Sequence, residues 1–210
     1  MSSRLTEVFG QWKRTFTEGK LPLVVVLYGD SDTLIKRAVQ TFLDHLFSGG
    51  GKALNYQTFD GRTTLPSQWV VAVRTAPMMA RQRVVHVTDA DGPLGGDGKA
   101  VPDDDLTGII DYLTNSKGKG VLILTARTVN TKGKVVAAVD QAGGLHPFTT
   151  FEKQHDVNQF IRTLFRRRKI SIDEAAVSYL ADALGRSAEA IISEVDKLSE
   201  YADQGRGITL

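Results

Sequence analysis

The sequence has no cysteine among its 210 residues. This absence excludes disulfide bonds, thiolate zinc sites and cysteine nucleophiles, and it fits a reducing compartment. Histidine is scarce as well: His45, His86, His146 and His155 are scattered along the chain without the spacing of metal ligands. We therefore expect no metal site and interpret each histidine as structural or exposed to solvent.

Long apolar runs are also absent. No stretch approaches the roughly 20 residues that a membrane-spanning helix needs. The first segment, MSSRLTEVFGQWKRTF, has the pattern of an amphipathic helix and lacks the features of a signal peptide. The formal net charge of +2 is too small to identify a polyanionic partner. The sequence predicts a soluble, cytoplasmic protein without a membrane partner.

Strand and helix patterns alternate over the first 150 residues. The run LVVVLY (23–28) is typical of a strand buried on both faces, and a helical pattern follows it. Further strand patterns, such as RVVHVTDA and VLILTA, alternate with helical ones, including a helix from residue 66 to about 76. This alternation predicts an α/β fold with a doubly wound, mostly parallel sheet and helices on both faces. The Gly-, Pro- and Asp-rich segment 89–105 is expected to be the most flexible loop.

The pattern changes near residue 150, where three amphipathic helical segments begin. The first carries an apolar stripe within EKQHDVNQFIRTLFRRRK. The second has Ser171 and Glu174 in capping-box register and ends at Gly185. We therefore predict an α/β domain at 1–150 and a small three-helix domain at 151–210.

The strand at 23–28 leads into GDSDTLIKRA (29–38), where a nucleotide-binding ATPase would carry its phosphate loop. The second glycine and the Gly-Lys-Ser/Thr sequence are missing. Asp30 and Asp32 place negative charge where phosphates would lie, and Lys36 is not followed by a hydroxyl residue. A second glycine-rich stretch, SGGGKAL (48–54), follows a helix where a phosphate loop would follow a strand.

Other elements of an ATPase site are missing too. Asp89 follows an apolar strand without a second acid beside it, which favours a strand-end cap. A helical lid usually offers an arginine to the γ-phosphate, but the corresponding positions hold Ala188 and Glu189, and Arg186 is a poor substitute. No nucleophile elbow surrounds any serine. We expect no catalytic residue and no cofactor; an active P-loop ATPase or helicase-loader relative is the alternative.

Taken together, three stretches of the chain resemble the δ subunits of bacterial DNA polymerase III, clamp-loader components that open the sliding clamp. They are LPLVVVLYGDSDTLIKRAV, FDGRTTLPSQWVVAVRTAPMMARQRVVHVTDA and RRRKISIDEAAVSYLADALGRSAEAIISEVDKLSEYADQGRGIT. The resemblance covers essentially all residues and rests on the order and spacing of these stretches. It implies an AAA+-like fold with a degenerate phosphate loop, followed by a helical lid domain. Family members continue into a helical collar domain, which we expect to be absent from this chain.

The resemblance also implies a function without catalysis in this chain. As part of a DNA-directed DNA polymerase (nucleotidyltransferase) complex, the chain would bind the sliding clamp (β subunit) and open it for loading onto primed DNA. The implied partners are clamp-loader ATPase subunits of the γ/τ and δ′ types. Such δ subunits insert two hydrophobic side chains into a pocket on the clamp, and the matching pair here is Met78 and Met79, after Pro77.

The residue types of this pair leave another interpretation open. Met78 and Met79 could pack between a helix and the following strand as ordinary core residues. Methionine is flexible and polarisable, so it also suits a docking surface. Trp69, Val70 and Val73 are expected on the buried side of the preceding helix.

The basic run RRRK is a candidate DNA contact; its residues are Arg166, Arg167, Arg168 and Lys169. A cluster of arginine and lysine can neutralise DNA phosphates. Basic residues near a helix carboxyl end are also favoured by the helix dipole, and a solvated face is the ordinary interpretation. A stand-alone nucleic-acid-binding module, the third hypothesis, has this run as its only support.

Overall fold

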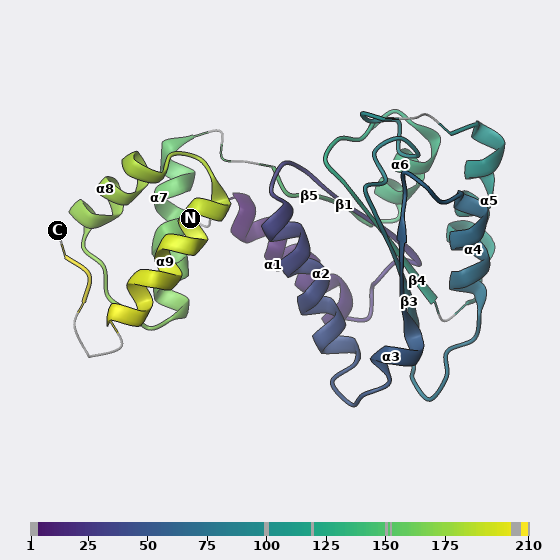
Figure 1. The fold of residues 1–210 in the computed structure, drawn as a ribbon, viewed down its shortest axis with the longest axis horizontal. Helices are drawn as coiled ribbons and strands as arrows, with labels where there is room; N and C mark the ends of the chain where they lie inside the picture. The colour runs from purple at the N-terminus through teal and green to yellow at the C-terminus, as the bar shows by residue number, and fades with distance from the viewer. Residues whose placement is uncertain are drawn as a thin grey trace. The chain divides into compact units, whose positions relative to one another are not determined.

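Residues 4–98, 101–118, 120–149, 151, 153–202 and 207–209 are described by a computed structural model (Figure 1). The chain divides into two compact units. Trp12–Phe148 forms the α/β unit, and Met1–Gln11 together with Thr149–Leu210 forms the helical unit. The domain limits expected from the sequence, 1–150 and 151–210, stay a prediction.

A parallel sheet with the strand order β2-β3-β4-β1-β5 forms the centre of the α/β unit. The strands are β1 (Val24–Tyr28), β2 (Tyr56–Asp60), β3 (Arg83–Thr88), β4 (Gly120–Ala126) and β5 (Leu145–Pro147). In the register of β1, Val24 lies opposite Leu122 and Val26 opposite Leu145. Most residues of β1, β3 and β4 are buried, as expected for strands covered on both faces.

Helices cover both faces of this sheet (Figure 1). They are α2 (Asp32–Leu46), α4 (Pro66–Arg74), α5 (Asp103–Asn115), α6 (Lys134–Gln141) and the part of α1 (Arg4–Thr17) from Trp12 onward, while α3 (Lys52–Asn55) leads directly into β2. Helices α4, α5 and α6 share one apolar core with alternate residues of β1, β3 and β4. On the other face, Trp12 Nε1 donates a hydrogen bond of 2.9 Å to the Ala38 carbonyl, and the Trp12 and Phe42 rings lie 5.5 Å apart. The predicted doubly wound sheet is confirmed.

Helix α4 places its apolar side against the sheet. Trp69, Val70 and Val73 are buried in the core of the α/β unit, which confirms the prediction for this helix. Val71, one residue along from Val70, is exposed. The orientation of α4 is therefore fixed by its apolar stripe.

Besides the first part of α1, the described residues of the helical unit form three helices: α7 (Gln154–Arg167), α8 (Glu174–Leu184) and α9 (Ala188–Ala202). The stripe expected on α7 is buried, and its members are Val157, Phe160, Ile161, Leu164 and Phe165. Helix α8 ends at Gly185, which has φ +63, as predicted for a glycine cap.

The predicted capping box at the start of α8 is wrong. Asp173 is the N-cap, and its side chain accepts a hydrogen bond of 2.6 Å from the Ala176 N–H. Ser171 lies two residues further back, where its carbonyl accepts a bond of 2.9 Å from the Ile208 N–H. The chain from 207 to 209 therefore engages the residue that the sequence pattern assigned to the cap.

The segment after β3 is packed more closely than its composition predicts. In its described part, residues 89–98, Leu94 is almost fully buried. Asp91 Oδ1 accepts hydrogen bonds of 2.9 Å from the N–H groups of Arg127 and Thr128, just after β4. A Cβ added at Gly96 would lie 2.2 Å from the Thr128 carbonyl oxygen, so only glycine fits there. Residues 99 and 100 lie outside the described residues.

Candidate functional site

The connection from α4 to β3 carries the methionine pair, and residues 75–82 are called the methionine loop below. Helix α4 ends at Arg74, so the pair lies beyond the helix and not on it. Met78 is 59% exposed and Met79 is 94% exposed. Core packing between helix and strand, the alternative that residue type left open, is therefore wrong for both side chains.

The backbone of the methionine loop is held at Met78. The Met78 N–H donates a hydrogen bond of 2.7 Å to Asn55 Oδ1, and Asn55 Nδ2 donates one of 2.7 Å to the Met78 carbonyl. Met79 follows with φ +55, a left-handed conformation that costs a residue with a side chain about 1–2 kcal/mol. The loop thus presents two apolar side chains to solvent from an anchored backbone.

The turn between β1 and α2 is short, comprising only Gly29, Asp30 and Ser31. Gly29 has φ +142, which favours glycine, and its N–H donates a bond of 3.1 Å to the Ala126 carbonyl. The Ser31 N–H donates to the Phe148 carbonyl at 3.4 Å. Two N–H groups of this turn therefore bind protein carbonyls, whereas a phosphate loop directs such groups at its ligand.

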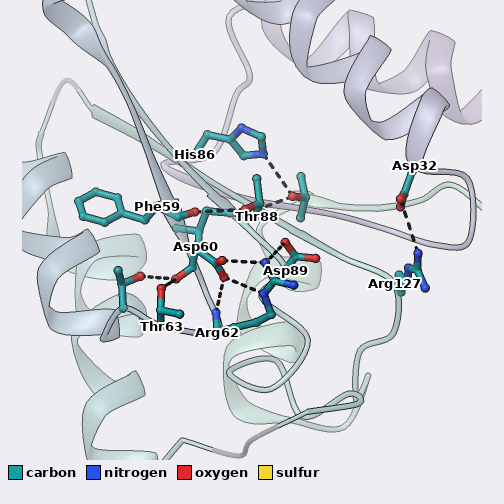
Figure 2. A network of polar contacts seen from close by, with 12 residues as sticks. Asp32, Phe59, Asp60, Arg62, Thr63, His86, Thr88, Asp89 and Arg127 are labelled. Atoms are coloured by element: carbon teal, nitrogen blue, oxygen red, sulfur yellow. Dashed lines mark hydrogen bonds and ion pairs between the residues drawn. The ribbon is translucent and has the colours of Figure 1, made fainter.

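A cavity of about 240 Å³ opens at the carboxyl ends of β3 and β4, where α/β sheets commonly bind ligands. Asp32, Lys36 and Arg127 are among its lining residues. Arg127 Nη2 lies 3.7 Å from Asp32 Oδ2, so an ion pair joins the start of α2 to the residue after β4 (Figure 2). The carboxylate of Asp32 is also favoured by the amino end of its helix.

Asp89 also lines this cavity and belongs to a second polar cluster (Figure 2). Arg62 Nη2 lies 2.8 Å from Asp60 Oδ2 and 3.5 Å from Asp89 Oδ2. The hydrogen bonds from Arg62 lower the pKa of Asp60 below its ordinary value. Within the part of the chain that the structure describes, no group of three or more His, Asp or Glu side chains is arranged to hold a metal ion.

His86 is a buried polar residue on β3. Its Nδ1 lies 3.0 Å from the Tyr56 hydroxyl and its Nε2 3.2 Å from Thr125 Oγ1. Since Thr125 donates its own hydroxyl proton to the Val87 carbonyl, the neutral ring fits with the proton on Nε2. Burial lowers the pKa of His86 to about 4. This histidine is structural, as the sequence pattern indicated.

The basic run divides into two kinds of residue. Arg168 forms an ion pair with Asp196 of α9, and its Nη1 donates a bond of 3.1 Å to the Leu164 carbonyl. Arg166, Arg167 and Lys169 are exposed. The run therefore offers three basic side chains to solvent and uses the fourth to join α7 to α9.

A groove of about 390 Å³ lies beside this run, lined by residues that include Arg162, Arg166 and Lys169. Arg162 makes two hydrogen bonds to the Glu174 carboxylate, at 2.9 and 2.5 Å. These bonds raise the pKa of Arg162 and lower that of Glu174. The charge that this groove offers a partner therefore comes from Arg166 and Lys169.

The position expected for a lid arginine is occupied by residues of other kinds. Ala188 is the first residue of α9 and is fully buried. Ser187 precedes it, and its Oγ accepts a bond of 3.2 Å from the Ala190 N–H in the manner of a helix cap. The start of α9 thus shows the packing and capping of an ordinary helix.

Three contacts near the candidate sites have no signal in a sequence pattern. The Asn55 side chain donates a hydrogen bond to the backbone carbonyl of Met78, which is 23 residues further along the chain. Arg127 forms an ion pair with Asp32, and the Asp91 carboxylate accepts a hydrogen bond from the Arg127 N–H just after β4. Each of these contacts joins segments that only the sheet brings together.

The parallel sheet with the strand order β2-β3-β4-β1-β5 and the helices on its two faces place the α/β unit in the class of doubly wound α/β folds. The family model described as "DNA polymerase III, delta subunit" matches residues 26–146, which is more than half of the chain. This chain therefore belongs to the DNA polymerase III delta subunit family. The resemblance found in the sequence is confirmed. No curated protein sequence matches the chain.

Solved structures agree with this fold. The DNA clamp loader delta protein of Bacillus subtilis is similar with a TM-score of 0.77 and 20% identity, over 96% of this chain and 60% of that one. A RuvB P216G mutant of Thermotoga maritima is similar with a TM-score of 0.52 and 13% identity, over 98% of this chain and 66% of that one. A DNA polymerase III gamma subunit-related protein of Thermotoga maritima is similar with a TM-score of 0.51 and 10% identity, over 92% of this chain and 62% of that one.

At these identities the likeness shows the fold, and it confirms the AAA+-like class expected from the sequence. The chain spans about 60% of the length of the Bacillus subtilis protein. Among the described residues, no helix is both long enough and apolar enough to cross a membrane.

Proposed function

We propose that this chain binds the sliding clamp and helps to open it for loading onto primed DNA, as a clamp-loader δ subunit that does not itself hydrolyse ATP. The observation that carries the proposal is the exposure of Met78 and Met79 on an anchored loop of a delta-family α/β unit. Pro77 precedes the pair and is half-buried. Met78 and Met79 are adjacent in the chain and both exposed, and contiguous exposed apolar surface can mark a site of protein interaction.

The energy available from this pair is sufficient for an anchoring contact. Burying two methionine side chains contributes roughly 3–6 kcal/mol before the costs of association are subtracted. A few deeply buried apolar side chains commonly dominate the affinity of a protein interface. Methionine also adapts its shape to a pocket.

The β1–α2 turn supports a role without nucleotide hydrolysis. Asp30 and Asp32 bring negative charge to the place where a phosphate loop would bind ATP, and the Gly29 N–H is used by the Ala126 carbonyl. In the proposed assembly, ATP hydrolysis belongs to partner subunits of the γ/τ and δ′ types. The AAA+-like fold then serves as the scaffold that presents the methionine loop.

The proposal also includes contact between this chain and primed DNA. The exposed residues of the basic run, Arg166, Arg167 and Lys169, are the groups we assign to it, and Arg168 contributes less because it is paired with Asp196. Long-range neutralisation of phosphates needs exposed basic side chains and no particular sequence of bases.

The test is the affinity of the full chain for its sliding clamp, measured by surface plasmon resonance. Met78→Ala/Met79→Ala is expected to raise Kd at least 100-fold, because both apolar anchors are removed. Val71→Ala is the matched control, since Val71 is an apolar side chain of α4 that is 70% exposed. This control should change Kd less than twofold.

Two outcomes would contradict the proposal in different ways. An unchanged Kd for the double variant would remove the assignment of the methionine pair. No binding of the wild-type chain to the clamp would remove the proposed function itself.

A further inference from the structure

Asn55 is the last residue of α3, and its side chain is completely buried. Its amide makes three hydrogen bonds, all to backbone atoms: to the Met78 N–H and to the Met78 carbonyl at 2.7 Å each, and to the Gly51 carbonyl at 2.8 Å. Asn55 therefore uses its acceptor and its amide donors to join two loops that lie far apart in the sequence.

The Asn55 side-chain amide pairs with the Met78 backbone in the way that the backbone of a neighbouring β-strand would. One carbonyl oxygen accepts from the N–H and one amide group donates to the carbonyl of the same residue. Aspartate lacks the donor, leucine lacks both groups, and glutamine is longer by one methylene. Asparagine is the side chain that matches both backbone groups of Met78 at this distance.

The glycine-rich stretch before α3 is the second support of the methionine loop. Gly51 has φ +84, and a Cβ added there would lie 3.5 Å from Ala80 Cβ and 3.6 Å from the Met79 carbonyl oxygen. The positive φ favours glycine, while the space around Gly51 would admit a Cβ in ordinary van der Waals contact with the methionine loop. The stretch SGGGKAL, which resembles a phosphate loop only in composition, thus packs against the residues that follow the methionine pair.

Arg83 fixes the far end of the loop, where β3 begins. Its Nη1 donates a bond of 3.3 Å to the Leu54 carbonyl, and its Nη2 donates one of 2.8 Å to Gln57 Oε1. Residues 51–57 therefore contact the loop at its middle and at its end. Between these attachments the side chain of Met79 is almost fully exposed.

We propose that Asn55 is the positioning residue of the methionine pair: it holds the Met78 backbone so that both methionines are presented to the clamp in a preformed arrangement. This inference rests on the proposed function. A preformed loop gives up less conformational freedom on binding than a mobile one, which raises affinity although the interface itself is unchanged. The free protein would already hold the loop in the arrangement that binds.

The first measurement uses the wild-type chain alone and follows amide hydrogen exchange by NMR. The Met78 N–H should exchange at least 100-fold more slowly than in an unstructured chain, although its side chain is exposed. In Asn55→Ala and Asn55→Asp the rate at Met78 should rise at least tenfold while the amides of β3 keep their protection. Exchange of the wild-type Met78 amide at the rate of an open chain would overturn the inference, whether or not the variants fold.

The second measurement is the affinity for the sliding clamp. Asn55→Ala and Asn55→Asp are expected to raise Kd at least tenfold, and Asn115→Ala, at an exposed asparagine of α5, should change it less than twofold. In the background of Met79→Ala, the loss of affinity from Asn55→Ala should be clearly smaller, because part of what Asn55 positions is already missing. A purely structural defect would give the same loss of affinity in both backgrounds.

The outcomes separate the two proposals. If Met78→Ala/Met79→Ala weakens binding and the Asn55 variants do not, or if the effects of Asn55→Ala and Met79→Ala on the binding free energy simply add, the positioning role is overturned and the proposed function stands. If the methionine variant binds as tightly as wild type, the proposed docking site fails, while the exchange rate at Met78 still reports whether Asn55 anchors the loop.

Discussion

Two buried histidines make the α/β unit sensitive to acid. His86 lies between the Tyr56 and Thr125 hydroxyls, and His146 packs against the Trp12 ring at 5.3 Å between ring centroids. Burial lowers the pKa of each from 6.5 to about 4. Between these two values the unfolded chain binds more protons than the folded one, so stability falls as the pH falls through this range.

We therefore expect the free energy of unfolding to be lower at pH 5 than at pH 7, by about 2 kcal/mol for each histidine. Urea denaturation at the two pH values measures this difference. In His86→Asn, which keeps a polar side chain without a titrating ring, the decrease should be about half as large. A variant that keeps the full decrease would show that His86 is not one of its sources.

At the scale of elements, helix ends depend on single side chains. Helix α8 begins with an Asp173 cap and is followed by Gly185, whose φ is +63. The cap satisfies a backbone N–H that has no partner within the helix. The same N–H groups carry the positive end of the helix dipole, which favours the Asp173 carboxylate.

Asp173→Ala is expected to lower the stability of the helical unit by about 1 kcal/mol, because the Ala176 N–H loses its acceptor. Asp173→Asn keeps an acceptor oxygen and is the matched control, with a smaller decrease in stability. Thermal unfolding followed by circular dichroism near 222 nm compares the two variants. Equal decreases would mean that the capping bond does not stabilise α8.

The elements themselves are predictable because their signals are local. The apolar run of β1, the helical spacing of α2 and the stripe on α7 each lie within a few turns of chain. The sequence pattern places the cap of α8 too early because Ser171 is as good a capping residue type as Asp173. In the structure, Ile208 forms a β-bridge with Ile172, and its N–H donates to the Ser171 carbonyl. Ser171 therefore lies in this pairing and not at the start of the helix, and its partner is over thirty residues away in the sequence.

The candidate site is predictable only in part. The position of Met78 and Met79 follows from the resemblance to a family, whereas their exposure is seen only in the structure, where α4 ends at Arg74 and the pair lies in the loop beyond it. The anchor at Asn55 has no local signature, since its partner lies in another loop. A composition rich in Gly, Pro and Asp also gives no indication that Leu94 is buried or that Asp91 fastens the segment after β3.

At the scale of the whole molecule, the two groups of residues assigned to partners lie on different units. Met78 and Met79 are exposed on the α/β unit, and Arg166, Arg167 and Lys169 are exposed on the helical unit. Both units also expose other apolar and basic side chains, so the proposed DNA contact is tested at the basic run itself.

Replacing Arg166, Arg167 and Lys169 with alanine should weaken DNA binding by the assembled clamp loader and its clamp and make it less sensitive to salt. The slope of log K against log salt should become less steep by about 0.9 for each phosphate that is no longer neutralised. Fluorescence anisotropy with primed DNA at several salt concentrations measures this slope. Lys132→Ala, at an exposed residue of the α/β unit, is the control, and an unchanged slope in the triple variant would rule out DNA binding by the basic run.

The strand order has a consequence for synthesis of the chain on the ribosome. Strand β1 pairs with β4 and β5, and Val24 reaches its partner Leu122 only after about 100 further residues have been made. At roughly 5–20 residues per second, this delay lasts about 5 to 20 s. During that time VVVLY is an apolar, β-branched segment without its neighbours, which is the kind of segment that aggregates. On the nascent chain, the first strand is therefore the segment for which we expect the longest exposure before its neighbours in the sheet are made.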